Sequence, residues 1–463
     1  MSDMTSSPPG GASDSRLYRA AWRWHFYAGL FVVPFLLILA VTGGIMMIFS
    51  GVGNELGYAP SVVQGPATLA VSEQARAALA SVPDGVLATY IAPEAADRAA
   101  YFEINKDGAW IAAAVDPYTG KVLAVGDESQ TLRAFAEKIH GTLLLGETGD
   151  HIMEMAASLA VVLIATGIYL WWPRKTGLIG QLIPKLSLRG RPLWRELHRT
   201  AGFWMVPVLL TFLLTGLAWS GLWGDTLVKP WSSFPANKWD SVPLSDTTHS
   251  ELNHDILHNV PWGLELTPMP ASGSTAGTPA VPQPVVLDTV ASWALANGFS
   301  GQHKIAVPSA ADGVYTVSND GRNEDGGSPG NDRYVHIDRY TGNVLADVRI
   351  EDYQPLGKVM AWGIALHKGM AGAWNFVLNL VFLALIIGIC VSGIVMWWKR
   401  RPAGAARLAA PPMPADMPMW KGAVLVGLTI SLAFPMAGIA LLVVLALDVL
   451  VLRFVRPLRA ILD

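Results

Sequence analysis

Four long apolar runs constrain the fold of this 463-residue chain more than any other feature of its sequence. They extend over about 25–49, 152–172, 194–222 and 374–398. A helix of about 20 apolar residues crosses the roughly 30 Å hydrocarbon core of a bilayer, so each run is long enough to span a membrane. The composition agrees, because 52% of the residues are hydrophobic and only 15% are charged. The chain is therefore predicted to be an integral membrane protein with the lipid bilayer as a partner.

Charge and cysteine content exclude several other classes of protein. The net charge of -3 provides no basic field that would collect phosphates, so no nucleic-acid partner is expected. The single cysteine, Cys390, cannot form an intramolecular disulfide, a thiolate zinc site or a cysteine-bound iron–sulfur cluster. Metal or redox chemistry would therefore depend on histidines, carboxylates or a bound cofactor.

Basic residues beside the apolar runs predict the topology. They gather before the first run, between the second and third, and after the fourth: Arg16, Arg19 and Arg23; Arg174, Lys175, Lys185, Arg189, Arg191 and Arg195; Lys399, Arg400, Arg401 and Arg407. By the positive-inside rule all three groups lie in the cytoplasm. The long polar stretches 51–150 and 224–366 then lie on the other side, which for a bacterial inner membrane is the periplasm.

The last apolar stretch, about 420–452, is too long for one untilted span and contains Pro435. A helical hairpin broken at Pro435, with both ends cytoplasmic, keeps the arginines from Arg453 onward inside. One long kinked helix is the alternative.

The predicted segments follow from these runs. They are a disordered tail (1–15), a first span (16–50), a first soluble domain with the helix before the second span (51–150), the second span (151–173), a basic cytoplasmic loop (174–193), the third span (194–223), a second soluble domain (224–366), a lead-in segment with the fourth span (367–399), a cytoplasmic linker (400–419), the C-terminal hydrophobic hairpin (420–455) and a cytoplasmic tail (456–463).

The chain also repeats itself, which points to an internal duplication. HFYAGLFVVPFLLILAVTGG from His25 and HRTAGFWMVPVLLTFLLTGL from His198 share H-x-x-A-G, V-P-x-L-L and T-G at identical spacing. IATGIYLWWPRKTG around Gly167 matches ICVSGIVMWWKRRPAG around Gly393, and VDPYTGKVLA in the first soluble stretch matches IDRYTGNVLA in the second. One unit of span, domain and returning span, present twice, predicts a four-helix bundle. Each soluble domain combines a helix with alternating apolar patterns, which predicts a helix on a small antiparallel sheet.

The paired D-x-Y-T-G-x-V-L segments resemble PepSY domains, and the H-x-x-A-G and T-G-x-x-x-W-W spans resemble PepSY-associated transmembrane helices, over about 17–402. The implied fold class is a membrane α-helical bundle, with four core spans from an internal duplication and a C-terminal hairpin or kinked helix, that carries two periplasmic α+β PepSY-like domains. The family includes iron-regulated inner-membrane proteins and haem-containing reductases of ferric siderophores. Transmembrane oxidoreductase activity is the resulting expectation.

Four histidines occupy equivalent positions of the repeat and are the candidate cofactor ligands. His25 and His198 open the first and third spans on the cytoplasmic side, and His140 and His367 precede the second and fourth on the periplasmic side. Neutral imidazoles from facing helices can hold a b-type haem, and no C-x-x-C-H motif for covalent attachment is present. We expect two bis-histidine haem b groups, one ligated by His25 and His198 and one by His140 and His367, which together conduct electrons across the membrane.

Alternatives to these ligands stay open. A histidine at the end of a span is often only an interfacial polar residue, although symmetric placement of four favours haem. His151 competes with His140 because it lies nearer the second span, but its counterpart in the repeat is Val377.

Other histidines carry weaker signals. His254 and His258 have the i, i+4 spacing of a metal pair but no carboxylate at a fixed offset, so an exposed polar helix that includes His249 is expected. His303 and His336 are expected to be ordinary sheet residues.

The resemblance implies a ferric siderophore as the periplasmic electron acceptor. Its hard oxygen donors hold Fe(III) far more strongly than Fe(II), so reduction releases the iron. One outer-sphere electron suffices, and no catalytic acid, base or nucleophile is expected. No G-x-G-x-x-G motif is present, so the electron donor would be a separate reductase or a membrane quinol. Two other classes stay open: a non-catalytic PepSY membrane protein that binds or regulates a periplasmic peptidase or receptor, and a transporter, which the few ionisable groups within the spans argue against.

Overall fold

The computed structural model describes residues 11–51, 60–174, 177–228, 241–252, 264–319, 328–401 and 421–447. The chain forms two compact units. The helical unit contains Met1–Thr42, Ile139–Leu227 and Leu380–Asp463, and the sheet unit contains Gly43–Lys138 and Val228–Asn379. The first ten residues of the predicted tail, His254, His258, most of the predicted linker and the C-terminal tail lie outside the described residues.

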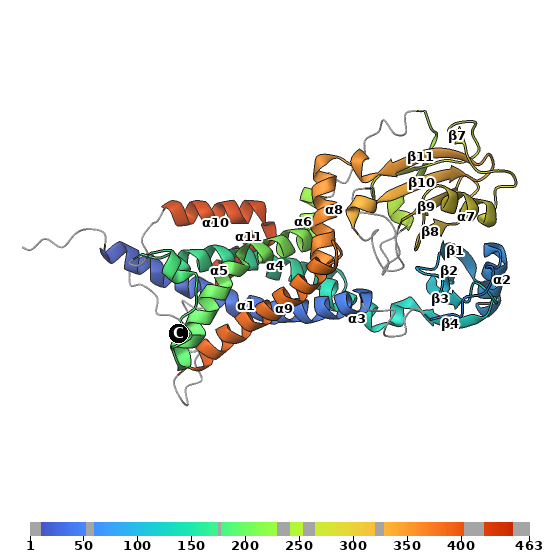
Figure 1. Ribbon diagram of the computed structural model, residues 1–463. Coiled ribbons are helices and arrows are strands. Elements are labelled where there is room, and N and C mark those ends of the chain that lie inside the picture. Colours follow the sequence, from blue (N-terminus) through green and yellow to red (C-terminus); the bar gives the residue numbers. More distant parts are fainter. Residues whose placement is uncertain are drawn as a thin grey trace, which may run out of the picture. The chain divides into compact units, whose positions relative to one another are not determined.

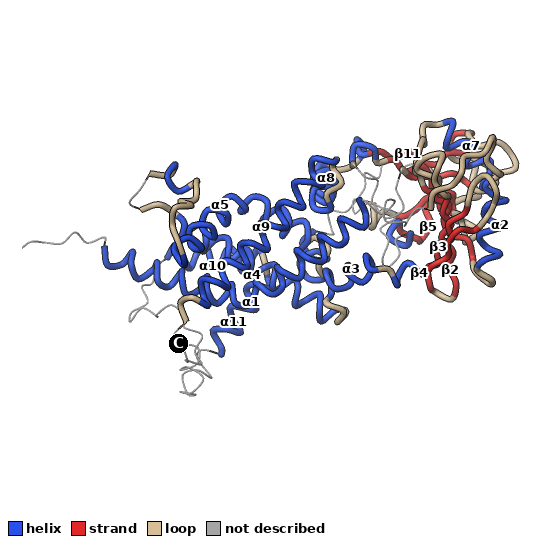
Figure 2. Tube along the Cα trace, turned by 60° about the horizontal axis from the view of Figure 1, so that its bottom comes forward, coloured by secondary structure: helices blue, strands red, loops and turns tan. Residues whose placement is uncertain are grey.

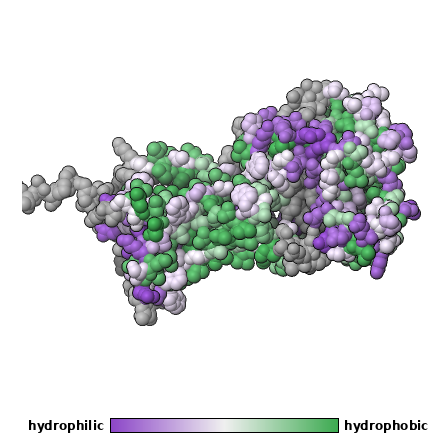
Figure 3. All heavy atoms as spheres, in the orientation of Figure 1, coloured by the Kyte–Doolittle hydropathy of each residue, from purple (hydrophilic) through white to green (hydrophobic). Residues whose placement is uncertain are grey.

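Four helices in the described part of the chain are long and apolar enough to cross a membrane, as the four apolar runs predict. They are α1 (Gly11–Gly51), α4 (Glu147–Trp171), α5 (Gly190–Leu217) and α9 (Ala373–Trp398), drawn as long coiled ribbons in Figure 1 and as blue tubes in Figure 2. Hydrophobic side chains cover the visible face of these helices in Figure 3. The protein is therefore a helical membrane protein.

Small and branched apolar side chains fill the interior of the helical unit. Val32 of α1, Ile164 of α4 and Leu213 of α5 pack in one buried cluster. Ala40 of α1, Met205 of α5, and Ile386 and Cys390 of α9 form a second cluster. Because α1 and α5 contribute to both clusters, they link α4 to α9.

The C-terminal apolar segment is interrupted where Pro435 predicts. Helix α10 (Lys421–Ala433) ends one residue before Phe434, and α11 (Pro435–Leu447) begins one residue after it. The Phe434 ring stacks on Trp223 at 5.9 Å, and the Trp223 indole N–H donates a 2.8 Å hydrogen bond to the Ala433 carbonyl. Trp223 ends the short helix α6 (Gly221–Trp223), so the break is fixed against a neighbouring element. Helix α11 packs against α4.

The sheet unit contains one antiparallel sheet, which among the described residues has nine strands in the order β4-β3-β2-β1-β8-β9-β10-β11-β7. Its strands are β1 (Val86–Ile91), β2 (Ala100–Lys106), β3 (Ala109–Val115), β4 (Val122–Asp127), β7 (Thr278–Pro279), β8 (Lys304–Ala306), β9 (Val314–Ser318), β10 (Arg333–Asp338) and β11 (Asn343–Arg349). A separate pair, β5 (Leu244–Thr248) with β6 (Pro268–Pro270), forms a second small sheet.

This single sheet differs from the two separate small sheets that the sequence predicts. Strand β1 pairs with β8, with Thr89 opposite Ala306 and Ile91 opposite Lys304, so the strands of both predicted domains join edge to edge. An unpaired strand edge exposes backbone hydrogen-bonding groups, and this pairing satisfies them for both halves. Each half still has the helix that its sequence predicts.

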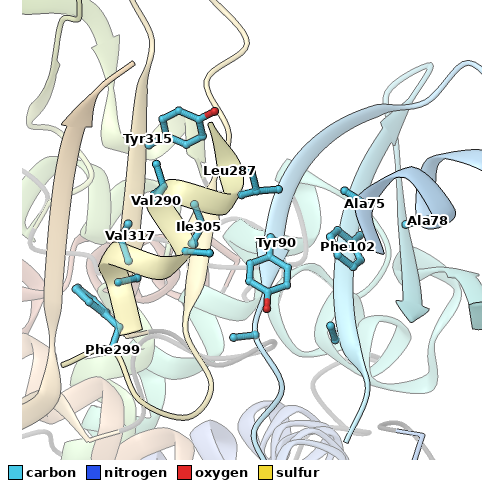
Figure 4. Packing of buried hydrophobic residues seen from close by; sticks show 14 of the residues in the cluster. Ala75, Ala78, Tyr90, Phe102, Leu287, Val290, Phe299, Ile305, Tyr315 and Val317 are labelled. Atoms are coloured by element: carbon cyan, nitrogen blue, oxygen red, sulfur yellow. The ribbon is translucent and has the colours of Figure 1, made fainter. Parts of the chain in front are cut away.

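Helices α2 (Val71–Ser81) and α7 (Leu287–Ala296) cover the joined sheet with a common apolar core. Figure 4 shows Ala75 and Ala78 of α2 beside Phe102, and Leu287 and Val290 of α7 near Ile305. The Asp288 carboxylate at the start of α7 accepts a 2.8 Å hydrogen bond from the Ser72 backbone N–H of α2. The two halves of the sheet unit therefore fold as one body.

The repeated D-x-Y-T-G segments are turns built in the same way. The Asp116 carboxylate accepts hydrogen bonds from the backbone N–H groups of Tyr118 and Thr119, and the Asp338 carboxylate accepts them from Tyr340 and Thr341. The glycine that closes the second turn, Gly342, has φ +75°, and a Cβ there would lie 2.3 Å from the Val281 carbonyl oxygen. These motifs shape hairpins in the sheet.

Two further helices lead into spans. Helix α3 (Leu132–Thr142) precedes α4, and α8 (Pro355–Lys368) precedes α9. Helix α8 ends at Gly369, which adopts the left-handed conformation with φ +82°. Its last carbonyls are satisfied by α9, because the Asn379 side chain donates to the carbonyls of Leu366 at 2.7 Å and His367 at 3.1 Å.

Candidate functional site

His25 and His198 come together inside the helical unit, although they are far apart in the sequence. His25 lies on α1 and His198 on α5. Their ring centroids are 6.3 Å apart, and the ring planes are nearly perpendicular at 86°. The structure therefore places side by side the two imidazoles that the repeat predicts as partners.

A hydroxyl on a neighbouring span orients each ring. His25 Nδ1 lies 3.0 Å from Thr166 Oγ1 of α4, and His198 Nδ1 lies 2.9 Å from Ser392 Oγ of α9. Both hydroxyls donate their own proton to a backbone carbonyl one turn back, Thr166 to Val162 and Ser392 to Ile389, at 2.8 Å each. Their oxygens are therefore acceptors toward the imidazoles, and each histidine donates from Nδ1.

The second histidine has a further acceptor that fixes its tautomer. His198 Nδ1 also lies 3.1 Å from the Ile389 carbonyl oxygen, which can only accept. With the proton on Nδ1, the lone pair of each ring is on Nε2. In metal-binding histidines the nitrogen that does not bind the metal usually donates a hydrogen bond to the protein. Here Nδ1 is hydrogen-bonded in this way, and Nε2 carries the lone pair that could bind a metal.

A glycine lies directly beside each ring. A Cβ added to Gly167 would lie 3.3 Å from His25 Cε1, and one added to Gly393 would lie 3.6 Å from His198 Cε1. Each glycine follows the hydroxyl residue that binds the same ring. Thr166-Gly167 therefore contacts His25 in the way that Ser392-Gly393 contacts His198. The histidines can approach the opposite helix closely because no side chain intervenes.

The spacing of the His25–His198 pair is compatible with two imidazoles that would hold one iron. A metal–nitrogen bond of about 2 Å and a ring centre about 1 Å beyond the nitrogen would put the two ring centres roughly 6 Å apart. The ring centroids are 6.3 Å apart in the structure. The donor set also fits, since two neutral imidazoles are the axial ligands of many b-type haems.

His140 is held like the other two, by a hydroxyl from a span. Its Nδ1 lies 2.9 Å from Thr42 Oγ1 of α1, and the Thr42 hydroxyl is within 2.7 Å of the Ile38 carbonyl. Thr42 is the threonine of the first T-G motif. His367 lies at the end of α8 and belongs to the sheet unit, whereas His140 belongs to the helical unit. The pairing of His140 with His367 thus stays a prediction of the repeat.

The competing candidate, His151, lies on α4 in a helical turn whose neighbouring carboxylates bind the start of α6. Its neighbour Asp150 accepts a 2.8 Å hydrogen bond from the Gly221 N–H, and the Glu154 carboxylate accepts from Leu222 and Trp223 at 3.0 and 3.1 Å. These carboxylates cap α6. Within the described ranges, no hydroxyl or carbonyl holds a ring nitrogen of His151. This difference favours His140 as the ligand.

His249 and His336 form a pair that the sequence does not predict. Both are fully buried, and their Nε2 atoms are 2.9 Å apart. His249 Nδ1 donates to the Thr267 carbonyl at 2.6 Å, and His336 Nδ1 lies 3.0 Å from Thr316 Oγ1. Burial lowers the pKa of both imidazoles, and the proximity of His249 lowers that of His336 further, so the pair is neutral.

The prediction of an exposed polar helix is therefore wrong for His249. The residue begins a 3₁₀ turn, His249–Leu252, and is buried against His336 of β10. Its burial depends on a strand 87 residues away, which the local polar pattern cannot reveal. His336 is a sheet residue as predicted, but it is also half of this pair.

The chain is a helical membrane protein in which two histidines from different spans lie side by side. The chain belongs to the PepSY-associated TM region family, whose model matches residues 22–400. The match includes all four candidate histidines, and it confirms the resemblance seen in the repeated motifs. No curated protein matches the chain.

Proposed function

We propose that this chain is a haem-containing electron-transfer protein of the bacterial inner membrane, which reduces a ferric siderophore from Fe(III) to Fe(II) in the periplasm and so releases the iron. The observation that carries the proposal is the His25–His198 pair, with its 6.3 Å separation and its two Nδ1 hydrogen bonds. A bound haem would supply reversible one-electron chemistry.

The residues around the pair would set the properties of the site. Thr166 and Ser392 accept hydrogen bonds from the Nδ1–H groups of the two histidines. These bonds raise the basicity of each Nε2 and fix the orientation of each ring plane. Gly167 and Gly393 keep the space beside the rings clear. The apolar clusters of the helical unit exclude water, so the site stays in a low-dielectric environment.

The second part of the proposal is an outer site formed by His140 and His367. Its support is the repeat, in which both residues precede a span at nearly the same distance, together with the Thr42 hydroxyl that holds His140. Thr215 is the repeat counterpart of Thr42, since each lies 17 residues after the histidine that opens its span. Two haem sites, one near each membrane face, would give single electrons a route from a cytoplasmic donor or membrane quinol to a periplasmic acceptor.

Reconstituted vesicles test the proposed activity. The full chain is inserted into liposomes that hold a reductant, and a ferric hydroxamate siderophore is added outside with a chelator that turns coloured on binding Fe(II). Colour should develop outside, and empty liposomes should stay colourless. A non-catalytic PepSY protein or a transporter would give no haem-dependent colour, and that outcome would refute the reductase.

Loss of the orienting hydroxyls should weaken haem binding without removing a ligand. Thr166→Val and Ser392→Ala each delete one Nδ1 acceptor, and second-shell changes of this kind cost about 10–100-fold in affinity. Ser392→Ala is expected to have the smaller effect, because the Ile389 carbonyl still holds His198. Titration of apo-protein with haem, followed at the Soret band, measures both. Equal affinities of wild type and Thr166→Val would argue against the assigned tautomer.

A further inference from the structure

Two arginines gather beside the paired histidines at the end of the helical unit that the charge rule assigns to the cytoplasm. Arg191 precedes His198 by seven residues on α5, and Arg400 follows Gly393 by seven residues at the end of α9. Seven residues are two helical turns, so Arg191 lies on the same face of α5 as His198. Arg400 lies two residues beyond the end of α9, and its backbone N–H donates to the Trp397 carbonyl three residues back.

The Arg400 side chain reaches across to α1 beside His25. Its guanidinium carbon lies 5.2 Å from the ring centroid of Trp22 and 5.0 Å from that of Phe26. These aromatic residues flank His25 in the sequence of α1. The guanidinium thus packs on the face of α1 next to His25, and the side chain is only half-exposed.

Arg191 and Arg400 are close enough to repel each other. The pKa of Arg400 is lowered, first by burial and then by the charge of Arg191. Within the part of the chain that the structure describes, no carboxylate forms an ion pair with Arg191. Two like charges that lie close together in a half-buried place repel each other, and an anion bound by both would relieve the repulsion.

Arg191 also has an unsatisfied donor. Its Nε has no hydrogen-bond partner among the described residues. Buried donors are rarely left without an acceptor. Arg191 and Arg400 therefore offer positive charge and N–H donors on this side of the histidine pair.

We infer that Arg191 and Arg400 bind the two propionate carboxylates of the haem that His25 and His198 would hold. The inference rests on the proposed function, and it orients that haem with its carboxylate edge toward the arginines. A haem carries two carboxylates on one edge, which matches two guanidinium groups. Charge-assisted hydrogen bonds from arginine to carboxylate are among the strongest in proteins.

The duplication provides a matched control. Arg174 follows Gly167 by seven residues, as Arg400 follows Gly393. Its side chain takes another direction, because its guanidinium carbon lies over Tyr18 at 5.0 Å and over Tyr169 at 4.7 Å, and it donates to the Tyr169 carbonyl. Arg174 is exposed and should play no part in propionate binding.

The test compares haem b with its dimethyl ester, in which both carboxylates are blocked. Full-length apo-protein from haem-deficient cells is titrated with each porphyrin at the Soret band. Wild type and Arg174→Gln should bind haem b roughly tenfold or more tightly than the ester. The Arg191→Gln/Arg400→Gln variant should bind both porphyrins equally, and its wild-type affinity for the ester shows that it is folded.

A second readout is the midpoint potential of the haem that His198→Ala removes. Loss of two positive charges favours the ferric state, so the midpoint potential of the double variant should be lower than that of wild type. Arg174→Gln should leave the midpoint potential unchanged.

The outcomes separate the two proposals. If wild type binds neither porphyrin, the proposed function fails. If wild type binds haem b and the double variant keeps the full preference over the ester, the inference about the arginines fails alone. If the double variant instead loses co-purified anionic phospholipid with no change in the preference, the arginines bind lipid phosphate, and the inference is again overturned.

Discussion

Replacement of His198 by alanine is expected to remove half of the bound haem and to stop electron passage across the membrane. In the proposed cytoplasmic site this imidazole would be one of two ligands, and its loss would leave the haem to His25 alone, whose ring centroid is 6.3 Å away. His25→Ala should have the same effect. Haem per polypeptide, from the absorbance of extracted haem, and Fe(II) formation by vesicles measure the two losses.

His249→Ala is the control for that experiment. His249 is buried in the sheet unit, where its imidazole is bonded to His336 and to the Thr267 carbonyl. Its loss should lower the stability of that unit and leave the visible spectrum unchanged. If His198→Ala and His25→Ala kept the full haem content and siderophore reduction, the ligand assignment would be wrong.

Gly167→Val should remove the cytoplasmic haem with every ligand still present. A Cβ added at Gly167 would lie 3.3 Å from His25 Cε1, closer than most real contacts of a Cβ. The two methyl groups of valine would displace the His25 ring from its present position. Overpacking of this kind costs about 1–3 kcal/mol, which corresponds to roughly 5–150-fold in haem affinity. Haem titration of the apo-protein measures the change.

Two other glycines calibrate this prediction. A Cβ at Gly393 would be 3.6 Å from His198 Cε1, an ordinary contact, so Gly393→Ala should keep its haem. Gly388 on the same span has open space around its Cβ position, and Gly388→Val should behave as wild type. A Gly167→Val protein with unchanged haem affinity would show that His25 is not held against this glycine.

The helical unit is the part of the molecule that the sequence predicts best. Span length and hydropathy depend only on local composition, so the four spans and the break before Pro435 could be located from the chain alone. The repeat also predicts that His25 and His198 meet, because they occupy equivalent positions of two similar spans. Both predictions use signals that are contained within one or two segments.

The sequence also contains a signal for Thr166 and Ser392, to which the spacing of the histidines alone assigns no role. They are the hydroxyl residues of the matched IATG and CVSG segments, and each precedes the glycine that contacts a histidine. The repeat keeps a hydroxyl at this position while it exchanges threonine for serine, as a hydrogen-bond acceptor allows.

The sheet unit contains the features that local patterns cannot predict. The pairing of Thr89 with Ala306 joins two halves of the sheet across more than 200 residues, and nothing in either strand specifies its neighbour. The buried His249–His336 pair depends on the same long-range packing. Alternation predicts a strand, whereas sheet order is decided by which edges meet.

Haem stoichiometry and ligation in the purified full-length chain test the central claim most directly. Two b-type haems per polypeptide are expected, each with a low-spin bis-imidazole signal in electron paramagnetic resonance, and His25→Ala should remove the signal of the cytoplasmic haem alone. The 86° between the His25 and His198 rings further predicts a strongly anisotropic form of that signal. A colourless protein from cells with ample porphyrin supply would contradict the account.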